Sequence, residues 1–244
     1  MWLALWLTAG AQADPQCVAH RGNNVAELEN SWASIRGAEA LGADAIEFDV
    51  VHTKDGVGLL MHDKTLRRVA EGPDCPVDAN LHNLDAAGVR AACTLNNGEE
   101  IPLLADVLTE AASWQATLFV ELKDVPSPAT VELLRTHKTA LGDRLRVISF
   151  DKDALQAVAP VDDLPLYKLA ITVVAPGVKR KLADRWHGWD LMMVRRRRVR
   201  RVARLGGEVA VWTINTPRRL ERMVRRGVHW ITTDDPGTCL SLTR

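Results

Sequence analysis

Short apolar runs alternate with stretches of helical periodicity along most of the chain. The apolar runs predict strands at residues 16–20, 45–51, 56–62, 116–123, 144–150, 164–170, 191–194, 208–215 and 228–234. Helical spacing of apolar residues predicts helices at 32–41, 83–91, 101–114, 129–141, 151–159 and 178–186, over the basic stretch that follows, and from Pro217. Alternation of strand and helix implies a parallel sheet.

The chain length then bounds the architecture. A chain of 244 residues suits a single (β/α)8 barrel, which typically needs about 250. The nine candidate strands are one more than an eight-stranded barrel needs, and the pattern leaves open which of them lies outside the barrel. The runner-up is an open doubly wound sheet, but no Gly-rich phosphate loop follows the first strand. We therefore predict an α/β fold of the TIM-barrel type.

The N-terminus and the cysteines indicate the compartment. Residues 1–13, MWLALWLTAGAQA, resemble the apolar part of a signal peptide that ends in a small-residue site. The alternative is a buried N-terminal segment. Cleavage would leave a mature domain at 14–244, in the periplasm or secreted. In an oxidising compartment Cys75 and Cys93 could form a disulfide, or they could be two unrelated buried thiols. The pairing of Cys17 with Cys239 stays open.

Charge adds less to the picture. The 31 basic and 31 acidic residues cancel, so global charge does not favour a nucleic-acid partner. The run RRRRVRR at 195–201 begins with Arg195 and ends with Arg201. It is typical of a solvated barrel helix. The alternative is weak attraction to an anionic membrane surface or to a phosphorylated substrate.

One strand carries two carboxylates that a pure core strand would not. Side chains alternate along a strand, so Glu47 and Asp49 share a face while Ile46, Phe48 and Val50 point the other way. Two adjacent carboxylates in a barrel interior repel each other and lose solvation. A hard divalent cation such as Ca²⁺ or Mg²⁺ between them would remove this cost. The alternative is a pair of salt-bridged structural acids.

Three further strands also end in charge. Glu121 and Lys123 share a face at the end of one, while His20 with Arg21 and His62 end two others. Arginine binds phosphate as a planar fork, and a divalent metal neutralises phosphate oxygens. Two histidines can divide the proton transfers of a displacement at phosphorus. The combination predicts phosphodiester cleavage at one rim of the barrel.

These stretches resemble the glycerophosphodiester phosphodiesterase family. The matching segments are AHRG (19–22), LEN (28–30), GADAIEFDVVHTKDGV (42–57), LLMHD (59–63), IPLLADVL (101–108), VELK (120–123), SFD (149–151), VWTIN (211–215) and GVHWITTDDP (227–236). The resemblance implies a TIM barrel with a small insertion after the third strand, which would be the irregular region at about 64–100.

The resemblance also implies residue roles. His20 and His62 would be the acid–base pair, and Glu47, Asp49 and Glu121 would be ligands of one Ca²⁺ or Mg²⁺. Arg21 and Lys123 would contact the phosphate, Glu29 would bind near the metal or the glycerol end, and Trp212 would form a pocket wall. Simple core packing is the alternative for Trp212.

The expected activity is metal-dependent hydrolysis of small glycerophosphodiesters to glycerol 3-phosphate and an alcohol. One alternative is a lysophospholipase D or sphingomyelinase D-like activity on lipids, which the arginine run and Trp186 with Trp189 make worth testing. An alternative of another class is a non-catalytic relative that binds metal or phosphate.

Overall fold

A computed structural model of the protein describes residues 14–170, 187–192, 196–204 and 206–244, apart from the side chains of residues 196 and 198. The predicted leader, the predicted helix at 178–186, Trp186 and the first arginine of the basic run lie outside the described residues. Within the described part of the chain, no helix combines the length and the apolar character needed to cross a membrane.

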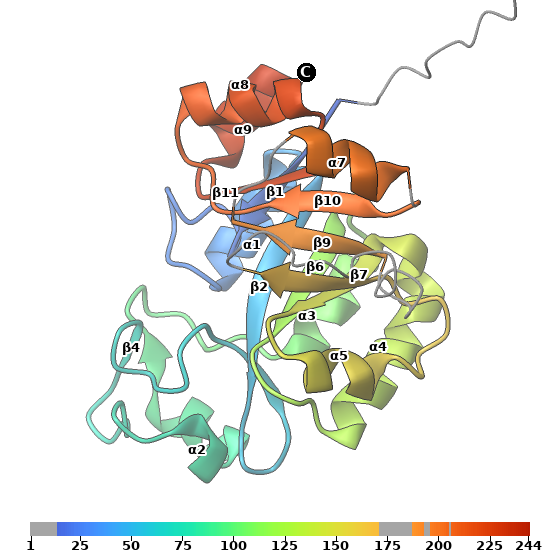
Figure 1. Cartoon of the computed structure of the whole chain (residues 1–244). Helices are drawn as coiled ribbons and strands as arrows, with labels where there is room; N and C mark the ends of the chain where they lie inside the picture. Colours follow the sequence, from blue (N-terminus) through green and yellow to red (C-terminus); the bar gives the residue numbers. More distant parts are fainter. Residues whose placement is uncertain (1–13, 171–186, 193–195, 205) are drawn as a thin grey trace, which may run out of the picture.

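Eight parallel strands close into a barrel in the described structure, as the sequence predicts (Figure 1). Hydrogen bonding between β1 and β2 joins the two ends of the sheet. The barrel strands are β1 (Gln16–His20), β2 (Ala45–His52), β6 (Thr117–Leu122), β7 (Leu145–Ser149), β8 (Leu166–Ala170), β9 (Gly188–Leu191), β10 (Glu208–Val211) and β11 (Trp230–Thr233).

The surplus strand is β3 (Gly58–Leu60), which pairs antiparallel with the far end of β2. It is third in chain order but lies outside the barrel. The expected strand at 191–194 lies three residues earlier, as β9. The strand therefore includes the buried Asp190, a residue that the hydrophobic pattern excluded, and it ends at Leu191, the first residue of the predicted run.

Helices fill most of the connections between the strands. They are α1 (Trp32–Ala40), α3 (Leu104–Ala111), α4 (Pro128–Leu141), α5 (Lys152–Val158), α7 (Arg196–Ala203), α8 (Pro217–Arg226) and α9 (Pro236–Thr243), with a 3₁₀ turn at Gly142–Arg144. Ser31 caps α1 by accepting a hydrogen bond from the amide of Ser34. Helix α3 is shorter than the predicted 101–114. The sequence analysis missed α9, which Asp235 caps and Pro236 begins.

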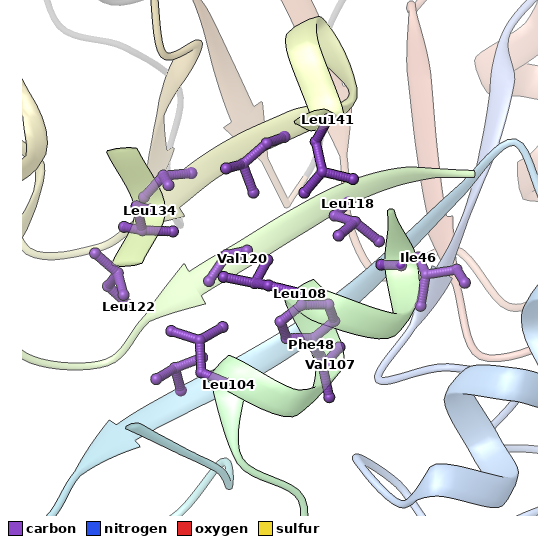
Figure 2. Packing of buried hydrophobic residues seen from close by; sticks show 14 of the residues in the cluster. Ile46, Phe48, Leu104, Val107, Leu108, Leu118, Val120, Leu122, Leu134 and Leu141 are labelled. Atoms are coloured by element: carbon purple, nitrogen blue, oxygen red, sulfur yellow. The ribbon is translucent and has the colours of Figure 1, made fainter. Parts of the chain in front are cut away.

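The two faces of β2 differ as alternation predicts. Ile46 and Phe48 belong to one buried cluster with Leu104 and Leu108 of α3, and Figure 2 shows Phe48 beside Leu108. Both residues of β2 are fully buried. The opposite face carries Ala45, Glu47 and Asp49 into the barrel. The strand is therefore anchored by its outer face, and its inner face is free to carry polar groups.

The inserted region forms a small lobe beside the barrel (Figure 1). It contains β4 (Ala70–Glu71), a 3₁₀ turn at Leu81–Asn83, α2 (Ala86–Ala92) and β5 (Thr94–Leu95). Leu66, Leu81 and Leu95 give it a core of its own. A disulfide joins Cys75 to Cys93 within the lobe, and a second one joins Cys17 of β1 to Cys239 of α9.

An arginine inside an aromatic cluster closes the amino end of the barrel. Arg146 of β7 lies 4.6 Å from the ring centroid of Trp230 and 2.7 Å from a carboxylate oxygen of Glu208. The Trp230 indole donates to the same oxygen at 2.6 Å, and the Tyr167 hydroxyl donates to it at 2.5 Å. The Glu208 carboxylate therefore accepts hydrogen bonds from three donors, namely Arg146, Tyr167 and Trp230. The Arg146 guanidinium also makes cation–π contacts with the Tyr167 and Trp230 rings.

Replacement of this arginine should destabilise the barrel. Arg146→Leu leaves the partly exposed Glu208 without its cation and removes the contacts of the guanidinium with three aromatic rings, so the free energy of unfolding should fall by about 1–2 kcal/mol. Urea unfolding measures the change. The matched control is Arg225→Leu, which breaks an exposed pair with Glu221 and should cost less than about 0.5 kcal/mol. Equal stability of the two variants would contradict a structural role for the cluster.

Candidate active site

The carboxyl ends of the barrel strands bring the predicted residues to one pocket. Parallel register places His20 opposite Glu47 and places Asp49 opposite Glu121. Strand alternation then turns these side chains inward. The pocket is lined by seven of the predicted residues: His20, Arg21, Glu47, His62, Glu121, Lys123 and Trp212. Asp49 lies in contact with Lys123 and Arg21, and Glu29 lies behind Arg21.

Three buried carboxylates form a cluster in this pocket. Glu47, Asp49 and Glu121 each place an oxygen within 4.8 Å of the others. One oxygen of Glu47 accepts a hydrogen bond from the Arg21 amide at 3.0 Å, and the other has no hydrogen-bond partner within the described structure. Burial, and after it the charges of Asp49 and Glu121, raises the pKa of Glu47 well above its usual range. Three carboxylates this close together, one with an oxygen that lacks a hydrogen-bond partner among the described residues, fit a hard divalent cation as ligands.

Asp49 contacts two cations, whereas Glu121 pairs with one of them, Lys123, at 2.7 Å. Lys123 lies 3.3 Å from one oxygen of Asp49, and the guanidinium of Arg21 lies 3.0 Å from the other. The Asn30 amide also donates to it at 2.9 Å. Burial alone would raise the pKa of Asp49, but Lys123 and Arg21 hold it below its usual value. Asp49 is therefore the most readily ionised of the three acids.

A tight turn after β1 aims Arg21 at the cluster. Arg21 has φ 56° and Gly22 has φ 83°. A Cβ at Gly22 would lie 2.1 Å from the hydroxyl oxygen of Ser34, so a side chain cannot be accommodated there. Arg21 also donates to Glu29 at 3.0 Å. The turn thus holds a guanidinium between two acids at the edge of the pocket.

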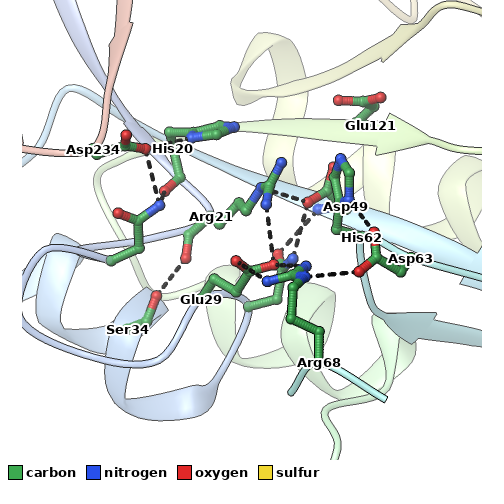
Figure 3. A network of polar contacts seen from close by, with 12 residues as sticks. His20, Arg21, Glu29, Ser34, Asp49, His62, Asp63, Arg68, Glu121 and Asp234 are labelled. Carbon is green, nitrogen blue, oxygen red and sulfur yellow. Dashed lines mark hydrogen bonds and ion pairs between the residues drawn. The ribbon is translucent and has the colours of Figure 1, made fainter. Parts of the chain in front are cut away.

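Each of the two histidines is held by a carboxylate. His20 Nδ1 lies 2.6 Å from Asp234, and His62 Nδ1 lies 2.7 Å from Asp63. Burial would raise the pKa of Asp234, but hydrogen bonds from His20 and Asn24 lower it to about 2. With Nδ1 engaged, Nε2 is the ring nitrogen that each histidine can offer to a substrate. In the view of Figure 3, Arg21 lies between the two rings.

The inserted lobe contributes Arg68, which links the two sides of the site (Figure 3). Arg68 donates to Asp63 at 2.8 Å and to both oxygens of Glu29 at 2.6 and 2.7 Å. It therefore connects the carboxylate that orients His62 with the one that holds Arg21. The sequence analysis missed Arg68 and Asp234, because Arg68 pairs with Glu29 across 39 residues and Asp234 pairs with His20 across 214. It included Asp63 in the matching segment LLMHD without giving it a role.

The opposite wall of the pocket is apolar. Phe150 and Trp212 meet edge to face with ring centroids 5.4 Å apart. Ile148 and Leu169 lie with them in the lining. Trp212 thus both lines the pocket and packs against neighbouring apolar residues of the barrel interior.

A fourth acid, Asp190 of β9, also lines the pocket, and the sequence analysis did not find it. Its side chain is buried, and one carboxylate oxygen has no hydrogen-bond partner within the described residues. Burial, and secondarily the charge of Glu121, raises the pKa of Asp190 to about 8. Asp190 lies two residues after the start of the short strand β9, and this position could have revealed it. The sequence analysis placed the strand at 191–194, so Asp190 fell before its predicted start.

Comparison with known proteins agrees with this arrangement. Residues 20–238 match the profile of the Glycerophosphoryl diester phosphodiesterase family. The chain is 29% identical over 238 residues to a glycerophosphodiester phosphodiesterase of Caldanaerobacter subterraneus subsp. tengcongensis, which covers 93% of this chain and 97% of that protein. Glycerophosphodiester phosphodiesterase 1 of Mus musculus is 31% identical over 59% of this chain and 45% of its own length.

Solved structures share the fold. A phosphodiesterase of Oleispira antarctica, in complex with the product sn-glycerol-3-phosphate, has a TM-score of 0.78 at 22% identity, over 94% of this chain and 96% of that one. A glycerophosphodiester phosphodiesterase of Agrobacterium tumefaciens has a TM-score of 0.76 at 21% identity, over 93% and 99%.

The crowded carboxylates predict how metal-free stability depends on pH. Burial, followed by the charge of Asp49, raises the pKa of Glu121 to about 7. A group that binds its proton more tightly when folded stabilises the fold below its unfolded pKa, about 4.3 for Glu. That stability is lost as the pH rises through about 7. In EDTA, the free energy of unfolding should therefore fall between pH 5 and 8, and Glu121→Gln should reduce the fall by about 2 kcal/mol.

Urea unfolding across this pH range measures the difference. The exposed Glu71 offers a control, because Glu71→Gln should leave the pH profile of the wild type unchanged. If the free energy of unfolding of Glu121→Gln depends on pH as in the wild type, the raised pKa assigned to Glu121 is contradicted.

Proposed function

We propose that this chain, which belongs to the Glycerophosphoryl diester phosphodiesterase family, hydrolyses glycerophosphodiesters to glycerol 3-phosphate and an alcohol with the help of a bound divalent cation. As a member of that family the chain is a phosphodiesterase, a phosphoric diester hydrolase. The observation that carries the finer proposal is the pocket itself, which combines three crowded carboxylates, two cations and two carboxylate-held histidines. The product bound to the Oleispira antarctica relative supports glycerol 3-phosphate as one product.

Glu47, Asp49 and Glu121 would hold the cation. Their oxygens are the ligands that Ca²⁺ and Mg²⁺ prefer, and binding would offset the burial and the mutual repulsion that raise the pKa of Glu47 and Glu121. A bound divalent cation supplies charge neutralisation at the phosphate oxygens. Arg21 and Lys123 add positive charge beside the same position, where negative charge grows as the nucleophile attacks phosphorus.

The two histidines divide the proton transfers. One accepts the proton of the nucleophile as the new P–O bond forms. The other donates a proton to the oxygen of the leaving alcohol as the old P–O bond breaks. Asp234 and Asp63 fix the ring orientation of His20 and His62 for these steps. The nucleophile is either water or the neighbouring glycerol hydroxyl, which would form a cyclic phosphate first. Incorporation of labelled solvent oxygen and trapping of a cyclic product distinguish the two routes.

A second candidate function is hydrolysis of lysolipids at a membrane surface. Exposed apolar side chains follow four barrel strands, namely Val25, Val125, Phe150 and Met192 after β1, β6, β7 and β9. The basic helix α7 exposes Arg197, Arg200 and Arg201 and could add weak attraction to anionic lipid. Sedimentation with anionic vesicles and an assay on lysolipid test this candidate. Absence of both binding and turnover removes it.

We also propose export to the periplasm or the medium. Two disulfides among the described residues are typical of an oxidising compartment. N-terminal sequencing of the mature protein should give a start near Asp14. A mature protein that retains Met1 in a reducing compartment would contradict export.

The proposed function is tested with glycerophosphocholine. The purified protein should release choline and glycerol 3-phosphate, EDTA should abolish turnover, and Ca²⁺ or Mg²⁺ should restore it. Phosphorus NMR identifies the product. Turnover that is indifferent to chelation would refute the metal role, and absence of turnover with every added ion would favour a non-catalytic binding relative.

The histidine roles are tested by substitution. His20→Ala and His62→Ala should each lower kcat on glycerophosphocholine by about 10²- to 10⁴-fold, because each removes one proton transfer. A glycerophosphodiester with p-nitrophenol as leaving group needs no general acid. One of the two variants should therefore regain activity on it, which identifies the acid. His137→Ala on the outer helix α4 serves as the control. Near-wild-type turnover in both site variants would refute the assignment.

A further inference from the structure

Asp190 is an acid that the proposed reaction does not use. Only 2% of its surface is exposed, and one of its oxygens lacks a hydrogen-bond partner within the described residues. A buried polar atom without a partner is costly, about 1–3 kcal/mol. Such an atom on a pocket wall is therefore a candidate contact for a ligand.

Asp190 is not placed to serve the metal or the histidines. The carboxylate cluster suited to a cation contains Glu47, Asp49 and Glu121 and excludes Asp190 among the described groups. The histidines already have their own carboxylate partners, Asp234 and Asp63. Asp190 is therefore available to the part of the substrate that reaches the bottom of the pocket.

The pocket changes in character from its floor to its mouth. Asp190 pairs with Ala210 of β10, and Trp212 follows two residues closer to the carboxyl end. Asp190 therefore lies one side-chain layer deeper than Trp212. Leu169 and Thr232 share the closed floor and are 3% and 4% exposed, whereas Phe150 at the mouth is 41% exposed.

The two ends of a glycerophosphodiester suit these two regions differently. The glycerol end carries hydroxyls that can both donate and accept hydrogen bonds, so it can satisfy a carboxyl group in either protonation state. The esterified choline group of the diester offers no hydrogen-bond donor, but its quaternary ammonium suits an aromatic wall such as Phe150 with Trp212. The enclosed floor also excludes a long acyl chain.

We infer that Asp190 binds the terminal hydroxyl of the glycerol moiety, so that the glycerol end enters the pocket first and the leaving alcohol stays at the apolar mouth. This inference rests on the proposed function. It makes the enzyme selective for a free glycerol end and tolerant of different alcohols. In a lysolipid this terminal hydroxyl is acylated. It can then donate no hydrogen bond to Asp190, and the acyl chain does not fit at the enclosed floor of the pocket.

The test compares two substrates that differ by one hydroxyl. They are glycerophosphocholine and 2-hydroxypropyl phosphocholine, which keeps the middle hydroxyl and lacks the terminal one. The wild type should prefer glycerophosphocholine by about tenfold or more in kcat/KM. Asp190→Leu should lose this preference, because its kcat/KM falls on glycerophosphocholine and changes less than about twofold on the analogue. Asp190→Asn, which keeps the shape and one acceptor, should show a smaller loss in the same direction.

Two controls separate the outcomes. The surface variant Asp162→Leu should keep the wild-type preference, and Ca²⁺ affinity should be the same in wild type and Asp190→Leu. Parallel losses on both substrates, a retained preference in Asp190→Leu, or weakened Ca²⁺ binding would overturn the inference. If Asp190→Leu fails to unfold cooperatively, Asp190→Asn decides. A wild type that hydrolyses neither substrate refutes the proposed function itself, whereas a wild type that hydrolyses both equally refutes this inference alone.

Discussion

The register between β1, β2 and β6 is the constraint on which the site depends. It sets His20 opposite Glu47 and Asp49 opposite Glu121, and a shift of β2 by one residue would turn Glu47 and Asp49 into the helical layer. The outer face of β2, with Phe48 against α3, fixes this register by burial. The hydrophobic core therefore does more than stabilise the barrel, since it also brings carboxylates together that would otherwise repel each other.

Cations and a separate lobe stabilise this arrangement. Asp49 is paired with Arg21 and Lys123, while Glu47 keeps an oxygen without a hydrogen-bond partner among the described residues. The lobe, closed by its own disulfide, supplies Arg68, which holds the acids behind both Arg21 and His62. Loss of the lobe would therefore affect the orientation of Arg21 and His62 although the lobe lies outside the barrel.

Local patterns predicted the parts of the site that share a strand. Alternation alone assigned Glu47 and Asp49 to one face, and the strand ends supplied His20, His62, Glu121 and Lys123. Partnerships across the barrel were not predictable in this way. The pairing of Asp234 with His20 spans 214 residues, and no local period encodes such a contact. Asp190 was missed because the apolar run at 191–194 shifted the expected strand past it, whereas β9 begins at Gly188 and ends at Leu191.

The site that we propose requires the carboxylates positioned by this register to hold one divalent cation beside the two histidines. Calorimetric titration of Ca²⁺ and Mg²⁺ into the metal-stripped protein tests it most directly. We expect the wild type to bind one ion per chain. The double variant with Glu47→Gln and Glu121→Gln should show no measurable binding at the same concentrations. Unchanged binding in the double variant, or no binding of either ion by the wild type, would contradict it.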